Sequence, residues 1–212
     1  MTTPIAILGA GRVATSLANG LAKSGHDIII GVREPQTVKP WDGPQARFAG
    51  QLEAIASADV IFNATPGDTS LERLTAMADT LAGKVLVDIA NATSRDAQGR
   101  PNGLLYPTDS LAERLQAALP QTHVVKTLNT MLAPVMSNPG ILATAPTVFL
   151  SGNDTNAKAT VRSLLAGMGW KDDWILDLGA IETARGPEAV MLLVPDIIKA
   201  RGFKPFAVSV AA

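Results

Sequence analysis

Residues 4–33 read as a strand, a glycine turn, a helix and a second strand, an order that restricts the chain to very few folds. Residues 5–8 form a short apolar run, which is typical of a buried parallel strand. The GAGRVA segment that follows matches the G-x-G-x-x-G/A pattern. In that pattern Gly9 permits a tight turn, Gly11 lets the backbone approach a pyrophosphate, and Ala14 is small enough for close packing of the helix on the strand. The segment therefore predicts a dinucleotide-binding unit.

The residues that follow the turn support this interpretation. Val13, Leu17 and Leu21 recur at helical spacing, and residues 28–30 form a second apolar strand. The start of such a helix presents free N–H groups and a partial positive charge to phosphates. The alternative is a tight turn in an α/β domain that binds no nucleotide. The complete strand–turn–helix–strand unit argues against that alternative.

The end of the second strand indicates which dinucleotide binds. NAD sites usually carry Asp or Glu there, about 20 residues past the glycines, to bind the ribose 2′-hydroxyl. This chain has Val32 and Arg33 instead, so a 2′-phosphate is favoured and NADP(H) is the predicted cofactor. Arg12 offers a second positive contact. Glu34 can pair with Arg33 and reduce its charge, and an arginine simply exposed to solvent is the alternative interpretation.

The composition argues against several other classes of protein. The net charge is −1 and no basic run is present, so nucleic-acid binding has no electrostatic basis. No apolar run approaches the roughly 18 residues of a membrane helix, and the first residues predict a strand, not a signal peptide. The absence of cysteine excludes disulfides, thiol catalysis and Cys-based metal sites, and no other metal-binding pattern is found. We expect a cytoplasmic protein with neither a nucleic-acid nor a membrane partner.

Strands alternate with helices along the rest of the chain. Further strands are predicted near residues 46–49, 59–64, 84–89, 122–127, 147–150, 173–176 and 205–210, and helices near 52–56, 69–81, 110–118, 155–168 and 182–200. Residues 91–109 are polar and rich in Gly, Pro, Asn and Asp, which predicts a long loop. The pattern predicts an α/β fold with a doubly wound parallel sheet and helices on both faces. We expect residues 1–140 to form the dinucleotide-binding domain and residues 141–212 a C-terminal helix–strand extension, packed on it as one unit.

Ligands of such sheets bind outside the carboxyl ends of the strands. The residues at those positions are small, polar or turn-forming, which suits a flat cofactor laid across a crevice. The predicted cofactor-binding residues are Gly9, Ala10, Gly11, Arg12, Val13, Val32, Arg33, Ala64, Thr65, Pro66, Ala90 and Asn91.

Groups able to transfer a proton are scarce near this edge of the sheet. His26 precedes a predicted strand and His123 begins one, so we expect both at the opposite, amino-terminal edge. Asp88 is interpreted as a buried strand-end residue. Lys126 and Asn129 are the candidate catalytic residues, although a structural role is the preferred interpretation of Lys126. Hydride transfer between two positioned rings needs few such groups, because positioning and electrostatics supply most of the catalysis.

The sequence also resembles a known family. The segments GAGRVATSLANGLAKSGHDIIIGVRE, ADVIFNATP, KVLVDIANAT, HVVKTLNTM, SGNDTNAKATV and VPDIIKARGFKPFAVSV are similar to those of NADPH-dependent oxidoreductases that use the deazaflavin coenzyme F420. The nucleotide-binding half of this family also occurs in metalloreductases of eukaryotic membranes. The resemblance covers nearly the whole chain.

The resemblance implies a homodimer of compact single domains. Hydride would move between the nicotinamide and a small-molecule redox partner, coenzyme F420 or a flavin, whose ring stacks on it. The NADP-binding positions of the family fall here on residues 9–13, Val32, Arg33, Thr65 and Pro66. The pocket for the second ring falls on Asn129, Thr130, Met131, Leu132, Gly202 and Phe203.

The chain departs from the archaeal members of this family at several positions. Those members carry a serine and a second basic residue around the arginine, where this chain has Val32 and Glu34, and Ala10 replaces a threonine. These changes remove contacts to the 2′-phosphate. Asn129 replaces a histidine of the second-ring pocket, which leaves the acceptor open. The alternatives are reduction of a small carbonyl or imine, helped by Lys126 or Asn129, and a regulatory protein that binds NADPH without chemistry.

Overall fold

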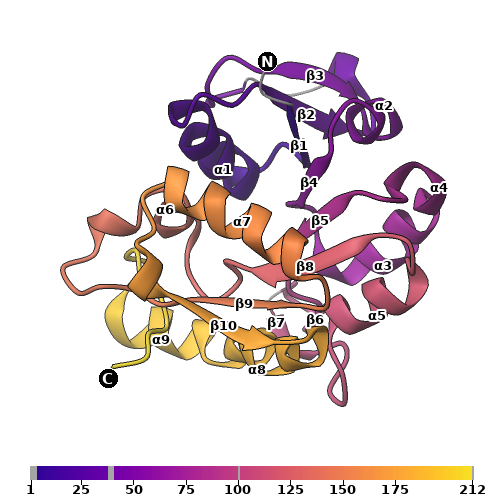
Figure 1. Cartoon of the computed structure of the whole chain (residues 1–212). Coiled ribbons are helices and arrows are strands. Elements are labelled where there is room, and N and C mark those ends of the chain that lie inside the picture. The colour runs from indigo at the N-terminus through magenta and orange to yellow at the C-terminus, as the bar shows by residue number, and fades with distance from the viewer. Residues whose placement is uncertain (1–3, 38–40, 100, 212) are drawn as a thin grey trace.

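The computed structural model describes residues 4–37, 41–99 and 101–211 of the chain (Figure 1). Within these ranges an eight-stranded sheet has the order β10-β9-β8-β5-β4-β1-β2-β3. Its strands are β1 (Ile5–Leu8), β2 (Ile28–Val32), β3 (Arg47–Gly50), β4 (Val60–Asn63), β5 (Val85–Asp88), β8 (His123–Thr127), β9 (Val148–Gly152) and β10 (Ile175–Gly179). This order places β1, and the glycine turn that follows it, inside the sheet and away from both edges.

The sheet is parallel from β3 to β8 and then reverses. The strands β1 to β5 and β8 pair in parallel, whereas β9 runs antiparallel to β8, and β10 runs parallel to β9. The prediction of an α/β fold with a doubly wound parallel sheet is confirmed by the parallel strands from β3 to β8, and the sheet departs from it where β9 pairs antiparallel with β8. A parallel neighbour for β8 requires a crossover to the opposite edge, usually through a helix. Residues 128–147 contain the short α6 (Ala133–Met136) and a 3-10 turn (Pro139–Ile141), so the chain enters β9 at the edge where β8 ends.

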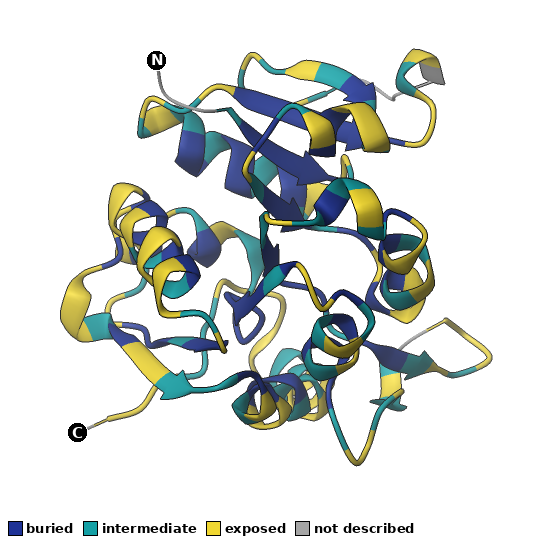
Figure 2. Ribbon diagram, turned by 45° about the vertical axis from the view of Figure 1, so that its right-hand side comes forward, coloured by how far each residue is buried: buried dark blue, intermediate teal, exposed yellow. Residues whose placement is uncertain are grey.

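Helices cover both faces of the sheet (Figure 1). The helices α1 (Arg12–Lys23) and α7 (Thr155–Gly167) pack on one face, and α2 (Gln51–Ala56), α3 (Gly67–Thr75), α4 (Ala78–Leu81) and α5 (Leu111–Ala118) pack on the other. Along β1, Ile5 and Ile7 join the core that contains α1, while Ala6 and Leu8 join the second core. The central strands are therefore buried on both faces, as Figure 2 shows in dark blue, which explains their uninterrupted apolar sequences.

The loop predicted over residues 91–109 contains a hairpin. The strands β6 (Thr93–Arg95) and β7 (Pro101–Leu104) pair antiparallel as a separate two-stranded sheet. The prediction of a continuous long loop is therefore wrong for the residues of β6 and β7. Both strands are short and polar, and β7 begins at a proline, so neither an apolar run nor an alternating pattern marks them in the sequence.

Two predicted helices are interrupted. The helix predicted over residues 69–81 divides into α3 and α4. The helix predicted over residues 182–200 consists of a 3-10 turn (Ile181–Ala184), α8 (Arg185–Ala189), a second 3-10 turn (Val190–Leu192) and α9 (Val194–Arg201). Pro187 and Pro195 account for the second interruption, because proline lacks the amide hydrogen that a continuous helix requires.

The strand predicted over residues 205–210 is reduced to an isolated bridge between Met131 and Ala207. The amide of Leu132 donates to the carbonyl oxygen of Phe206 at 3.0 Å, and the amide of Val208 donates to Thr130 at 3.0 Å. The partner of this segment is the turn after β8 and not a strand, so the ladder cannot continue. The segment instead reaches the carboxyl edge of the parallel strands.

The residues from 141 onward share a sheet and a core with the rest of the chain. The strands β9 and β10 extend the main sheet, and Ile181 and Ala184 lie in the second core together with Leu111 of α5. Across the described ranges, no helix combines the length and the apolar character needed to cross a membrane.

Candidate cofactor and acceptor site

Two adjoining cavities lie at the carboxyl ends of the parallel strands, the edge at which such sheets bind ligands. The outer cavity, of about 1210 Å³, is lined by Gly9, Ala10, Gly11, Val32, Arg33, Glu34, Gln51, Ala64, Thr65, Pro66, Asp68, Thr69, Arg73 and Arg95. The inner cavity, of about 920 Å³, extends from the glycine turn toward β5, the turn after β8, and α9. Both cavities are lined by Ala10, Gly11, Ala64, Thr65, Pro66 and Arg95, so they meet at the glycine turn.

The glycine turn between β1 and α1 keeps its backbone open toward the cavities. Gly9 has φ +105°, and a Cβ at this position would lie 2.8 Å from the carbonyl oxygen of Ala64. A Cβ on Gly11 would meet no described protein atom within 4 Å. Gly11 is also the N-cap of α1, and no side chain of the described residues caps the helix there. The first amide groups of α1 are therefore available to an anionic group such as a phosphate.

Three arginines from three elements line the outer cavity. Arg33 follows β2, Arg73 lies on α3 and Arg95 ends β6. Arg95 forms an ion pair with Asp68 at 3.5 Å. Among the residues that the structure describes, Arg33 forms no ion pair, and in particular none with Glu34. The alternative in which Glu34 pairs with Arg33 is therefore not found, and Arg33 lines the outer cavity without an ion-pair partner among the described residues.

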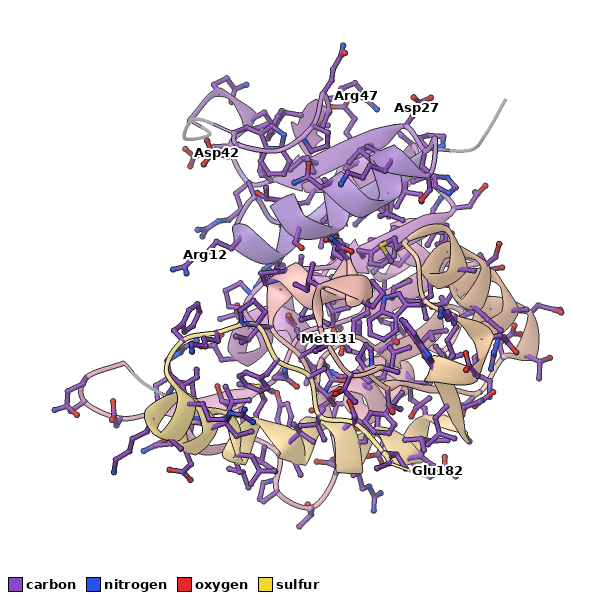
Figure 3. The ribbon with its side chains drawn as sticks, turned by 90° about the vertical axis from the view of Figure 1, so that its left-hand side faces the viewer. Arg12, Asp27, Asp42, Arg47, Met131 and Glu182 are labelled. Carbon is purple, nitrogen blue, oxygen red and sulfur yellow. The ribbon has the colours of Figure 1, made fainter. Side chains whose placement is uncertain are left out.

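Arg12, which the sequence offers as a second positive contact, lies apart from Arg33. It lines the inner cavity and not the outer one. Figure 3 shows its side chain projecting outward from the start of α1. Arg12 is the first residue of α1, so the start of this helix sets the direction of its side chain, whereas Arg33 is positioned by the end of β2.

The lining of the inner cavity is largely apolar. The apolar residues include Trp41, Ile89, Met131, Leu132, Pro134, Met136, Met191, Val194 and Phe203. Asn91 and Asn129 add amide groups from the turns after β5 and β8. No histidine, lysine, tyrosine or cysteine occurs among the described residues of this lining. Groups that donate or accept protons near neutral pH are therefore as scarce in the cavity as the sequence predicts.

The fold brings most of the predicted site residues to these cavities. Those that line one or both are Gly9, Ala10, Gly11, Arg12, Val13, Val32, Arg33, Ala64, Thr65, Pro66, Ala90, Asn91, Asn129, Met131, Leu132 and Phe203. Thr130 and Gly202 line neither cavity. The Thr130 side chain is buried, and its Oγ1 has no hydrogen-bond partner among the described residues.

Two asparagines join the turns after β5 and β8. Asn91 Nδ2 donates to the Asn129 carbonyl oxygen at 3.0 Å, and Asn129 Nδ2 donates to Asn91 Oδ1 at 2.9 Å. Leu128, the residue before Asn129, has φ +59°, a conformation that is rare for leucine. These features fix Asn129 in the cavity wall, with one of its two amide hydrogens donated to Asn91.

Lys126 lies beneath the cavities and lines neither of them. Its Nζ is 2.8 Å from Asp88 Oδ2 and 2.9 Å from Glu188 Oε1, and it donates to the carbonyl oxygen of Ala90. Burial lowers the pKa of Lys126, but the charges of Asp88 and Glu188 outweigh it and raise the pKa above its ordinary value. The structural interpretation of Lys126 agrees with this geometry, whereas a role as proton donor does not.

Glu188 on α8 is not predicted from the sequence. Its Oε2 accepts a hydrogen bond from the Leu111 amide at 2.9 Å and its Oε1 accepts one from the Ala112 amide at 3.1 Å, at the start of α5. A carboxylate is favourable at this end of a helix, and here it also pairs with Lys126. No local pattern identifies Glu188, because all three partners reach it through the tertiary fold.

A buried polar network holds the turn after β4. Asn63 Nδ2 donates to Asp88 Oδ1 at 2.8 Å and to Ser70 Oγ at 3.1 Å. Thr65 Oγ1 donates to Asn63 Oδ1. Since Thr65 and Pro66 line both cavities, the network fixes the part of the cleft where the two cavities meet.

The two histidines lie where their sequence positions predict. His26 precedes β2. His123 begins β8, and its Nδ1 lies 3.4 Å from Asp154 Oδ2. Neither lines the outer or the inner cavity. Within the described ranges, no group of three or more acidic, histidine or cysteine side chains is arranged to hold a metal ion.

Comparisons with known proteins relate this fold and cleft to reductases. Residues 4–92 match the family described as NADP oxidoreductase, coenzyme F420-dependent. The crystal structure of a proposed F420-dependent NADP reductase from Arthrobacter sp. FB24 is 39% identical in sequence, and the match covers 100% of both chains with a TM-score of 0.91.

Two curated relatives bear different functional names. Metalloreductase STEAP3 of Rattus norvegicus is 34% identical over 89% of this chain and 36% of its own length. The F420-dependent NADP reductase of Methanocaldococcus jannaschii is 28% identical over 90% of each chain. The chain therefore spans 36% of the metalloreductase but most of the archaeal reductase.

Proposed function

This chain belongs to the F420-dependent NADP oxidoreductase family, and we propose that it transfers hydride between the nicotinamide of NADP(H) and a deazaflavin or flavin-like ring. It is, as a member of that family, an NADP-dependent oxidoreductase. The observation that carries the acceptor class is the inner cavity. This cavity is roomy, mostly apolar and poor in proton-transfer groups, and it adjoins the glycine turn. Such a cavity suits a flat ring whose reduction depends on positioning.

The residues of the outer cavity fit NADP(H). The open amides at the start of α1 would hold the pyrophosphate, and Gly9 and Gly11 leave the backbone free to approach it. Arg33, which has no ion-pair partner in the described chain, would hold the 2′-phosphate. Thr65 and Pro66 would support the cofactor where the two cavities meet. The bound nicotinamide supplies the hydride.

The residues of the inner cavity orient the reacting rings. Met131, Leu132 and Phe203 form apolar walls, and the paired Asn91 and Asn129 keep the turns after β5 and β8 at a fixed separation. Rigid walls limit the motion of one ring over the other, which lowers the entropic part of the barrier.

Reduction of a small carbonyl or imine with Lys126 as the proton donor is a weaker alternative. Lys126 is 1% exposed, and its ammonium group is already surrounded by Asp88, Glu188 and the Ala90 carbonyl. One amide hydrogen of Asn129 is likewise donated to Asn91 Oδ1. No described feature of the inner cavity favours this chemistry over hydride transfer between rings.

The test is anaerobic oxidation of NADPH in the presence of F420, FMN, FAD or riboflavin, followed by the nicotinamide absorbance. Turnover with at least one of these acceptors is expected. A Leu132→Trp variant should abolish that turnover by filling the inner cavity, while NADP⁺ binding measured by calorimetry is retained. Binding of NADPH without turnover with any of the four acceptors would contradict the proposal and favour a regulatory role.

We also propose that the chain forms a homodimer, as the family resemblance implies. Exposed apolar side chains support this, since Leu192 and Leu193 precede α9, and Phe203 follows it. Light scattering should therefore give twice the mass of one chain at micromolar concentration, and Leu193→Asp should shift the mass toward the monomer. A monomeric wild-type protein would overturn this part of the proposal.

A further inference from the structure

Arg73 lies on α3 and Arg33 follows β2, yet both residues line the outer cavity. Its side chain is partly buried, and its Nη2 donates to Thr69 Oγ1 one turn earlier on the same helix. This bond restrains the guanidinium at the cavity wall. Two elements that are not neighbours in the sequence thus bring two guanidinium groups to one cavity.

The two arginines are poorly neutralised by the protein. Asp68, which also lines the outer cavity, forms its ion pair with Arg95 at 3.5 Å. In the described part of the chain neither Arg33 nor Arg73 has a carboxylate within ion-pair distance. Burial lowers the pKa of Arg73, the charge of Arg33 lowers it further, and Asp68 opposes both effects. The repulsion between two positive charges that line one cavity falls when an anion binds between them.

We propose that Arg73 and Arg33 together hold the 2′-phosphate of NADP(H), so that Arg73 is a second residue that selects NADP(H) over NAD(H). This inference rests on the proposed binding of the adenosine ribose at the end of β2. Arginine suits the role because its planar group can donate two hydrogen bonds to one phosphate. In this chain α3 would thereby supply the second positive charge that is absent from the position after Arg33, which is occupied by Glu34.

The other two arginines near the cleft are placed differently. Arg95 lines both cavities, and its guanidinium is bound to Asp68 and to the Gly99 carbonyl at 2.9 Å. Arg12 lines the inner cavity but not the outer one. Arg73 lines the outer cavity but not the inner one, and the outer cavity is also lined by Val32 and Arg33. Arg12 therefore offers a matched control for the loss of one positive charge near the cofactor.

The experiment compares two probes that differ by the 2′-phosphate alone, adenosine 2′,5′-bisphosphate and adenosine 5′-monophosphate. Calorimetry gives the affinity of each probe for the wild type and for Arg73→Met, Arg73→Lys and Arg12→Met. Arg73→Met should weaken the bisphosphate about tenfold to hundredfold, the range expected for loss of a charged hydrogen bond, and leave the monophosphate nearly unchanged. Arg73→Lys should fall between Arg73→Met and the wild type, because it keeps the charge and loses the planar fork. Arg12→Met should leave the ratio of the two affinities unchanged.

The possible results separate this inference from the proposed function. If the wild type prefers the bisphosphate and Arg73→Met retains that preference, the role of Arg73 is overturned and NADP(H) selection at Arg33 stands. If Arg73→Met weakens both probes equally, Arg73 contacts the adenosine and the inference is again wrong. If the wild type shows no preference, both the inference and the 2′-phosphate site at Arg33 fail. Should Arg73→Met not fold, Thr69→Val removes the anchor of Arg73 and should reduce the preference to a smaller extent.

Discussion

Replacing Lys126 with methionine should destabilise the protein more than any loss of a surface charge. The substitution keeps most of the length of the side chain but removes the ammonium group, so Asp88 and Glu188 stay buried without the cation that lies 2.8 and 2.9 Å from them. Removing one partner of a buried ion pair typically costs about 3–5 kcal/mol, because the remaining charge is uncompensated. With Lys126 1% exposed and two carboxylates left behind, we expect a loss at the upper end of that range, about 4–5 kcal/mol.

The assay is urea unfolding with linear extrapolation of the free energy of unfolding to water. Lys158→Met is the control, because Lys158, 12% exposed, pairs at 2.9 Å with an Asp177 that is 39% exposed and stays in contact with water when the pair is lost. The loss should therefore lie closer to the roughly 0–1 kcal/mol of exposed ion pairs than to that of Lys126→Met. Adding Asp88→Asn to Lys126→Met removes one of the two unpaired charges and should recover part of the loss. A loss no larger than that of Lys158→Met would refute the argument that Lys126 is a buried structural cation.

The pH dependence of the same measurement provides a second check. The folded-state pKa of Lys126 is raised, so its contribution is fully present below the unfolded value of about 10.4 and is lost as the pH rises through the folded value. The stability difference between the wild type and Lys126→Met should therefore be constant from neutral to mildly alkaline pH. It should shrink only in strongly alkaline solution.

Two further substitutions test the glycine turn and an ion pair at the start of α5. Gly9→Ala should lower the free energy of unfolding in urea by about 1–3 kcal/mol because its φ is +105°, and by more because the new Cβ would lie 2.8 Å from the Ala64 carbonyl oxygen. Gly83→Ala is the control, because Gly83 has φ +74° and a Cβ there meets no described atom within 4 Å, so it gives the conformational cost alone. An equal cost at both glycines would exclude the contact. Hydrogen bonds from Arg185 lower the pKa of Glu113, so Glu113→Gln should reduce the melting temperature at neutral pH. The difference in melting temperature should disappear as the pH falls below the unfolded-state value of about 4.3 and through the lower pKa of Glu113 in the folded state. A difference that persists in acid would contradict a stabilising ion pair between Arg185 and Glu113.

The N-terminal unit could be predicted because its information is local. The apolar run, the glycines and the helical spacing all lie within residues 4–33, and each requires the same strand–turn–helix order. The direction of β9 could not be predicted in this way. It depends on whether residues 128–147 cross the sheet, and their composition does not distinguish a crossing from a return along the same edge.

Some residues of the candidate site can likewise be identified from local sequence, and others cannot. Arg33 is identified by its distance along the chain from the glycines, and that distance is fixed by one helix and one strand. Arg73, Arg95 and Glu188 reach the cavities, or the lysine beneath them, from α3, the β6–β7 hairpin and α8. Their positions follow from the packing of distant elements, so no spacing rule identifies them in one sequence.

The attachment of residues 206–208 makes the far end of the chain a reporter of cavity occupancy. Leu132, which lines the inner cavity, holds Phe206 through its amide, and Val208 is bound to Thr130 on the same turn. A ligand that packs against Leu132 rigidifies this turn and with it the two hydrogen bonds, so binding should slow the release of the segment. Limited proteolysis after α9 should therefore be slower with the acceptor present than with the cofactor alone. The susceptibility of this segment to a protease then measures acceptor binding without any observation of hydride transfer.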